Sequence, residues 1–182
     1  MDLLVGLSLM AVSAGGVFAG FKGSLKAWTI AQQYAGEQHN ARTVLDWATR
    51  RLRMAGNSFA GTAIDVAKAD DIVFFADTND NGVAECHRLY LNTVERVVYT
   101  YVGEVASCAT QVGEPMSANV EAQTLAVTAL TLRYFDGSGN LLTPLPLTQA
   151  QRTVVRRVEL TIAANGLQFL PPFTLSTQVF IR

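Results

Sequence analysis

A chain of 182 residues can hold one apolar helix and one domain of about 125 residues, which is large enough to bury a core. Its 14 Lys and Arg nearly balance its 15 Asp and Glu, for a formal net charge of -1. This composition indicates no bulk electrostatic attraction to nucleic acid or to an anionic surface. The sequence also lacks a nucleophile-elbow motif and a phosphate-binding glycine pattern, so we expect no enzymatic role.

The chain begins with an uncharged apolar run from Leu3 to Phe21. As a helix, these roughly 19 residues would span about 28 Å, close to the hydrocarbon thickness of a bilayer. No proline interrupts the sequence from Asp2 to Gly56, so we expect one helix over this whole range. We interpret residues 1–24 as a membrane-spanning segment. A secretory signal peptide and a buried core helix are the alternatives, but the run has no basic start and is long for an internal helix.

The later part of this helix has an amphipathic pattern. Small and large apolar residues recur at spacings of four and three, and most polar side chains lie off this stripe. The stripe consists of Ala41, Leu45, Ala48, Leu52 and Ala55. We therefore expect helix 25–56 to form the spine of a domain covering residues 25–182.

The rest of the chain is dominated by strand patterns, which predict an α+β fold: a long helix, half transmembrane and half amphipathic, packed on an antiparallel sheet within residues 71–182. Residues 57–70 are expected to be a connection with little regular structure. The segment 141–147 contains Pro144 and Pro146, so it is expected to be an edge or a loop. The predicted strands are 71–76, 83–91, 94–102, 125–135, 153–163 and 173–182.

One loop has spacing typical of a calcium site. Asp77, Asn79, Asn81 and Glu85 could supply oxygen ligands, and calcium is the only cofactor that the sequence suggests. However, Arg88 stands where such a loop needs a bidentate glutamate. A hairpin turn at Asn81 and the glycine after it explains the same residues without an ion.

Two segments carry a family resemblance. Residues 1–12 resemble the start of a type IV pilin-like protein, and residues 41–56 resemble the helix end of PilW-type minor pilins and of J-type pseudopilins of type II secretion. Weaker similarity continues in Arg133–Asp136 and in the closing residues 177–182. The resemblance extends over most of the chain, but only its first third is specific.

The resemblance implies a structural subunit of a type IV pilus or of a pilus-like secretion fibre. Such a subunit is held in the bacterial inner membrane with a periplasmic domain, and then packs its apolar helix among other pilins or pseudopilins. Asp2 would take the place of the family's glutamate and pair with the terminal amine of a neighbouring subunit. A helix N-terminal aspartate favoured by the helix dipole is the simpler interpretation.

A domain outside the cytoplasm makes Cys86 and Cys108 a natural disulfide pair, although two buried thiols are the alternative. Zinc is not expected, because His39 and His87 do not share ligand spacing with the cysteines.

Two other functions remain open: a tip module that binds through residues 103–116 and 137–147, and a stand-alone single-pass membrane protein. Nucleic acid is not an expected partner. Two arginine clusters could nevertheless contact DNA phosphates if they converge in space. They are Arg50, Arg51 and Arg53, and Arg152, Arg156 and Arg157.

Overall fold

The computed structural model describes residues 2–103, 108, 113–115, 127–164 and 172–181, without the side chains of residues 2–5, 7–9, 11–12 and 114–115. Two helices and eight strands form the described fold, and all strand pairs are antiparallel. The elements are α1 (Asp2–Leu52), β1 (Ile64–Ala67), β2 (Asp71–Ala76), β3 (Glu85–Asn92), β4 (Val97–Gly103), β5 (Glu114–Pro115), β6 (Val127–Phe135), α2 (Gln149–Thr153), β7 (Arg157–Ala164) and β8 (Phe173–Phe180).

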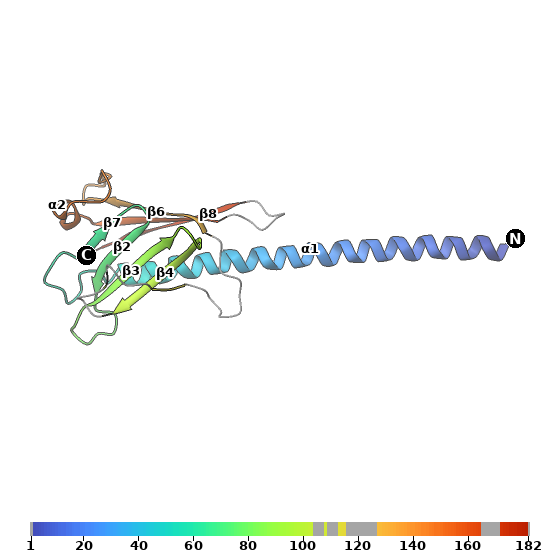
Figure 1. Cartoon of the computed structure of the whole chain (residues 1–182), viewed down its shortest axis with the longest axis horizontal. Coiled ribbons are helices and arrows are strands. Elements are labelled where there is room, and N and C mark those ends of the chain that lie inside the picture. Colours follow the sequence, from blue (N-terminus) through green and yellow to red (C-terminus); the bar gives the residue numbers. More distant parts are fainter. Residues whose placement is uncertain (1, 104–107, 109–112, 116–126, 165–171, 182) are drawn as a thin grey trace.

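Helix α1 is continuous for 51 residues, and its N-terminal half projects far beyond the domain (Figure 1). The single long helix expected from the sequence is therefore confirmed, although it ends at Leu52 rather than at Gly56. The last residues leave the helix because they join β2: the Gly56 N–H donates to the Phe75 carbonyl at 2.8 Å, and Ala55 forms a bridge with Ala76. Gly56 has a positive φ of 85°, a conformation that glycine adopts without strain.

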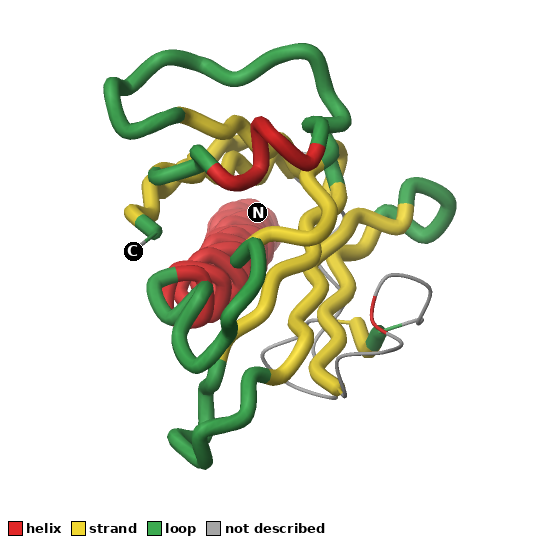
Figure 2. The backbone as a smooth tube through the Cα atoms, turned by 90° about the vertical axis from the view of Figure 1, so that its left-hand side faces the viewer, coloured by secondary structure: helices red, strands yellow, loops and turns green. Residues whose placement is uncertain are grey.

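The predicted apolar stripe of α1 is buried along its whole length, as expected. It shares one hydrophobic core with Phe74 of β2, Leu89 of β3, Leu132 of β6 and Leu160 of β7. Viewed along α1, the strands lie above and beside the helix (Figure 2). The stripe is therefore covered by strands that come from widely separated parts of the chain.

The predicted α+β packing of a long helix on antiparallel strands is confirmed, but the strands form two sheets rather than one. The order is β1-β2-β3-β4-β5 in the larger sheet and β6-β7-β8 in the smaller. Where the sheets meet, β6 does not pair with a strand of the larger sheet. It donates hydrogen bonds to the turn between β1 and β2 instead. The Leu132 N–H donates to the Ala69 carbonyl at 2.7 Å, and the Tyr134 hydroxyl donates to the Lys68 carbonyl at 2.9 Å. The second sheet thereby packs its own apolar face on α1.

Two further expectations need correction in the segments that connect the strands. Residues 57–70 contain β1, a four-residue strand whose end residues Ile64 and Ala67 are buried against the core. Residues 114–115 form the short strand β5, within a stretch that was expected to be a loop. Both strands are too short for their side-chain alternation to stand out in the sequence.

The strand expected over 153–163 starts later than predicted, because helix α2 occupies its beginning. Thr148 and Gln151 form a capping box at the N-terminus of α2, and β7 starts at Arg157. A threonine followed three residues later by a glutamine is a recognised start signal, so this helix could have been predicted locally. Residues 141–147, with their two prolines, form a loop as expected.

Candidate assembly surface

The projecting half of α1 carries an exposed apolar seam, formed by Phe18, Phe21, Leu25 and Trp28. Spacings of three, four and three residues place these side chains on one face of the helix. Phe21 is 63% exposed and Trp28 is 61% exposed, whereas the stripe further along the same helix is buried. Large apolar side chains exposed along one helix face are typical of a surface that contacts another protein or a membrane.

Membrane insertion was the sequence-based interpretation of this part of the chain. Among the side chains that the structure describes, no helical stretch is both long and apolar enough to span a bilayer. Several side chains of the run from Leu3 to Phe21 lie outside that described set. Asp2 begins α1, but its side chain is also outside the described residues, so its predicted contact with a neighbouring subunit stays a prediction.

The suggested calcium loop connects β2 to β3, and its residues bond one another. The buried Asp77 carboxylate accepts hydrogen bonds from Ser58 Oγ at 3.0 Å, from the Gly82 N–H at 2.8 Å and from the Asn81 N–H at 3.2 Å. Burial acts to raise the pKa of the Asp77 carboxyl, but these hydrogen bonds outweigh it and hold the pKa below the usual value. Asp77 therefore organises a tight hairpin loop.

The other suggested ligands also act as acceptors within this loop. The Asn79 side-chain oxygen accepts from the Asn81 N–H at 3.0 Å, and the Asn81 side-chain oxygen accepts from the Val83 N–H at 2.7 Å. Glu85 accepts from the Thr78 N–H at 2.9 Å and from the Asn79 amide. In the part of the chain that the structure describes, no three His, Cys, Asp or Glu side chains gather as a metal site. The hydrogen bonds suit the hairpin turn, and the alternative of a calcium site stays untested.

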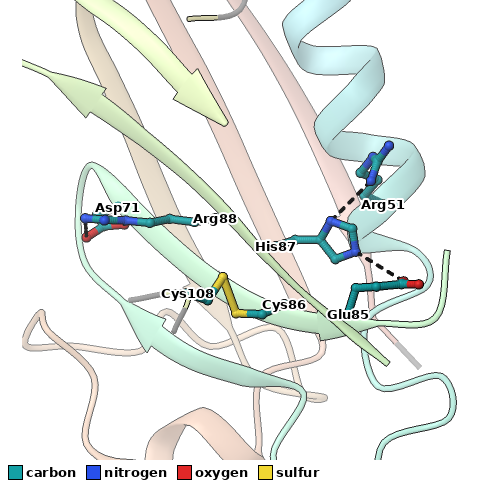
Figure 3. Close-up of a disulfide and its surroundings, with 7 residues drawn as sticks. All are labelled: Arg51, Asp71, Glu85, Cys86, His87, Arg88 and Cys108. Atoms are coloured by element: carbon teal, nitrogen blue, oxygen red, sulfur yellow. Dashed lines mark hydrogen bonds and ion pairs between the residues drawn. A yellow bond between two sulfur atoms is a disulfide. The ribbon is translucent and has the colours of Figure 1, made fainter. Parts of the chain in front are cut away.

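Arg88, which occupies the position of the missing calcium ligand, forms an ion pair with Asp71 (Figure 3). Its Nε lies 3.0 Å from Asp71 Oδ1, and its Nη2 lies 3.1 Å from Asp71 Oδ2, so the contact is bidentate. Lys68 also contacts Asp71, at 3.1 Å. A planar guanidinium suits this two-point contact with a carboxylate. The arginine therefore ties β3 to the first residue of β2.

Cys86 and Cys108 are joined by a disulfide in the structure, with an S–S distance of 2.20 Å (Figure 3). Both cysteines are buried, in a small second core with Val73, Phe75 and Ala84. The disulfide attaches residue 108 to β3, at a point 22 residues earlier in the chain. Of the segment 103–116 predicted as a contact loop, most residues lie outside the described part of the structure.

A partly buried polar contact that the sequence did not indicate joins α1 to β3. Arg51 Nη1 lies 3.2 Å from His87 Nδ1, and the His87 ring stacks on Phe74 and meets Trp47 edge-on. The two polar residues are 36 positions apart and belong to different elements. No local pattern could have identified them as partners. His39, by contrast, is exposed on α1, so the two histidines do not form one site.

Only some arginines of the two clusters lie near one another in the folded domain. Arg51 contacts His87, and the Arg157 guanidinium lies 4.0 Å from the centre of the Phe135 ring. Arg53 lines one groove, while Arg152 and Arg156 line a second. Both grooves are bordered by Gly56 and Ile181, so they adjoin.

No protein-family model and no curated protein matches the chain. Among solved structures, the chain is similar to a type IV-like pilin from Thermus thermophilus, with a TM-score of 0.54 and 14% sequence identity. The match covers 81% of this chain and 94% of that one. At this identity the likeness concerns the fold: a long N-terminal helix packed against antiparallel sheets, which is the type IV pilin-like α+β fold.

Proposed function

We propose that this protein is a structural subunit of a type IV pilus or of a pilus-like secretion fibre. The observation that carries the proposal is the exposed apolar seam on α1. The half of α1 that bears this seam projects from the domain (Figure 1). Burying one such aromatic or aliphatic side chain is worth about 1.5–3 kcal/mol, so the seam favours a state in which it is covered. The helices of other pilin-like subunits would supply that cover in the fibre.

Before assembly, the cover would be the bacterial inner membrane, with the domain in the periplasm. A disulfide between Cys86 and Cys108 suits an oxidising compartment of this kind. Asp2 would pair with the terminal amine of a neighbouring subunit during assembly. The resemblance of residues 41–56 to PilW-type minor pilins and to J-type pseudopilins supports a minor subunit that primes or caps the fibre.

The proposal can be tested by shearing fibres from the bacterium that makes this protein. The wild-type chain should be recovered with the sheared fibres, and cysteine pairs placed along the seam should cross-link it to other pilin-like subunits. Phe21→Glu should abolish both results, because a charge buried between apolar helices is unfavourable. Gln33→Glu adds the same charge at an exposed polar position of α1 and should be tolerated.

The domain should melt at the same temperature in both variants, because neither position belongs to the core. A wild-type chain that is expressed in membranes but never found in sheared fibres or cross-linked to another pilin would contradict the proposal. That result would favour a stand-alone membrane protein with an outer domain.

A further inference from the structure

Strand β8 is an edge strand of the smaller sheet. It pairs with β7, and among the described residues no strand pairs with its other side. The Ile181 N–H donates to the Arg156 carbonyl on the β7 side at 2.8 Å. Since backbone groups alternate in direction along an antiparallel strand, the N–H and C=O groups of Gln178 and Phe180 point to the open side. An edge of this kind is a template for pairing with another extended chain.

A groove runs past this edge. Its volume is about 710 Å³, and it lies between Gln178 and Phe180 of β8 and the segment from Arg53 to Asn57 that follows α1. A second groove, of about 450 Å³, adjoins it and is bordered by residues 59–64 and by the end of α2. The segments that border the grooves include the residues just after α1 and the end of α2. These segments lie at the end of the domain opposite the projecting half of α1 (Figures 1 and 2).

The charged side chains that line these grooves, among the described residues, are all positive. The described lining includes Arg53, Arg152 and Arg156, and no aspartate or glutamate. Arg53 and Arg156 are exposed. Arg156 Nη1 donates to the carbonyls of Thr153 and Val155, which orients the guanidinium but leaves its charge without a carboxylate in the groove. A ligand with negative charge would complement this lining.

Apolar surface lies between the charges. Phe180 is 69% exposed, and Met54 is partly buried on the other wall of the same groove. An extended chain places alternate side chains on opposite faces, so it could direct apolar groups to this surface while its main chain follows the β8 edge. Double-stranded DNA would find phosphate contacts here, but it would leave the backbone groups of the edge unpaired.

We propose that this groove binds an extended, acidic segment of a partner protein, which pairs with β8 as an additional strand and directs its carboxylates to Arg53 and Arg156. This inference does not depend on the chain being a fibre subunit. The free edge supplies affinity through main-chain hydrogen bonds, and the arginines select for acidic sequences.

The test uses the full chain in detergent micelles and a fluorescent octapeptide of alternating glutamate and valine. Fluorescence anisotropy should show saturable binding that weakens as salt is added, and the matching lysine–valine peptide should not bind. Gln178→Pro removes an outward N–H without breaking the β7–β8 ladder, and it should weaken binding about tenfold. Gln178→Ala shortens the same side chain but keeps that N–H, so it should weaken binding less than Gln178→Pro does. Arg53→Gln combined with Arg156→Gln should also weaken binding of the acidic peptide.

Hydrogen exchange provides a second measurement that does not require a variant. The amides of Gln178 and Phe180 should exchange more slowly when the peptide is bound, because they become paired. The proposal is overturned if the acidic peptide shows no saturable binding, if the lysine peptide binds equally well, or if those amides gain no protection. Binding of duplex DNA but not of peptide would indicate a nucleic-acid interface instead. Self-association that Gln178→Pro abolishes would make a second copy the occupant.

Discussion

Arg51 Nη1 lies 3.2 Å from His87 Nδ1 and joins the end of α1 to β3 inside the domain. An arginine side chain can only donate, so Nδ1 accepts and the neutral ring carries its proton on Nε2. That nitrogen has no hydrogen-bond partner within the described structure and lies 3.9 Å from Glu85 Oε2. Burial, followed by the nearby Arg51 charge, lowers the pKa of His87 from 6.5 to about 4. The contact therefore depends on a histidine that stays neutral.

This contact predicts a loss of stability in mild acid. Between pH 6.5 and about 4 the unfolded chain binds a proton at His87 that the folded chain does not, so the free energy of unfolding falls as the pH falls. The expected contribution is about 3 kcal/mol over this range. Urea denaturation at a series of pH values should show a flatter profile for His87→Gln than for the wild type. His39→Gln alters an exposed histidine and should keep the wild-type slope; equal slopes for all three proteins would contradict the prediction.

Asp71 pairs with both Arg88 and Lys68, and we expect the loss of Arg88 to destabilise the domain more than the loss of Lys68. Removing Arg88 leaves the buried Asp71 carboxylate with Lys68, whose side chain is 51% exposed, whereas that of Arg88 is only 15% exposed. Arg88→Ala should therefore cost about 2–3 kcal/mol, and Lys68→Ala less than about 1 kcal/mol. Equilibrium urea denaturation measures both values. Equal costs would show that the bidentate contact does not stabilise the domain more than the exposed lysine does.

The Cys86–Cys108 disulfide should stabilise the domain chiefly by restricting the unfolded chain. For a loop closed over 22 positions, the chain-entropy model predicts a loss of about 3 kcal/mol in the variant with both cysteines changed to serine. A reducing agent should lower the melting temperature of the wild type to near that of the variant. It should leave the variant unchanged, which controls for effects of the reagent elsewhere.

The packing of α1 on the sheets can be tested at Leu52, which is fully buried. Leu52→Asp places an unpaired charge in the core and should unfold the domain, as should Leu45→Asp. Leu52→Ala should cost about 2–5 kcal/mol through lost contacts and a cavity. Asp46→Ala, at an exposed position of the same helix, should change stability by less than about 0.5 kcal/mol. Circular dichroism during heating would reveal a folded Leu52→Asp, which would contradict the observed packing.

We expect calcium not to stabilise the protein through the loop at Asp77. Its oxygen atoms already accept hydrogen bonds from within the loop and from Ser58, so an ion would have to displace these bonds. Millimolar calcium chloride should leave the melting temperature unchanged, whereas a bound ion would raise it. Asp77→Asn should lower stability equally with and without calcium, because the carboxylate serves the turn. A melting temperature that rises with calcium in the wild type alone would establish the site instead.

Local patterns in the sequence were enough to predict much of the fold. The buried face of α1 follows from residue spacing along one helix, and most strands follow from their own alternation of side chains. Helix α2 also has a local signal, the capping box of Thr148 and Gln151. Strand β1 has no such signal, because four residues with a central polar side chain show too little alternation.

Relations between distant segments could not be predicted in the same way. Where the two sheets meet, the Leu132 N–H donates a hydrogen bond to the carbonyl of Ala69, 63 positions earlier in the chain. No residue pattern within either segment indicates this partner. The same holds for Arg51 with His87, and for the arginines that line the adjoining grooves.

The sequence by itself determined the long helix, its exposed apolar half and its buried stripe, because a helix is stabilised and patterned by neighbours three and four positions away. Only the tertiary structure decided which strands share a sheet, which polar side chains from distant segments meet, and that β8 keeps an open edge beside a basic groove. Those features arise when the folded chain brings remote segments together. The free energy of such a contact depends on both segments, so the residue pattern of one segment alone does not predict it.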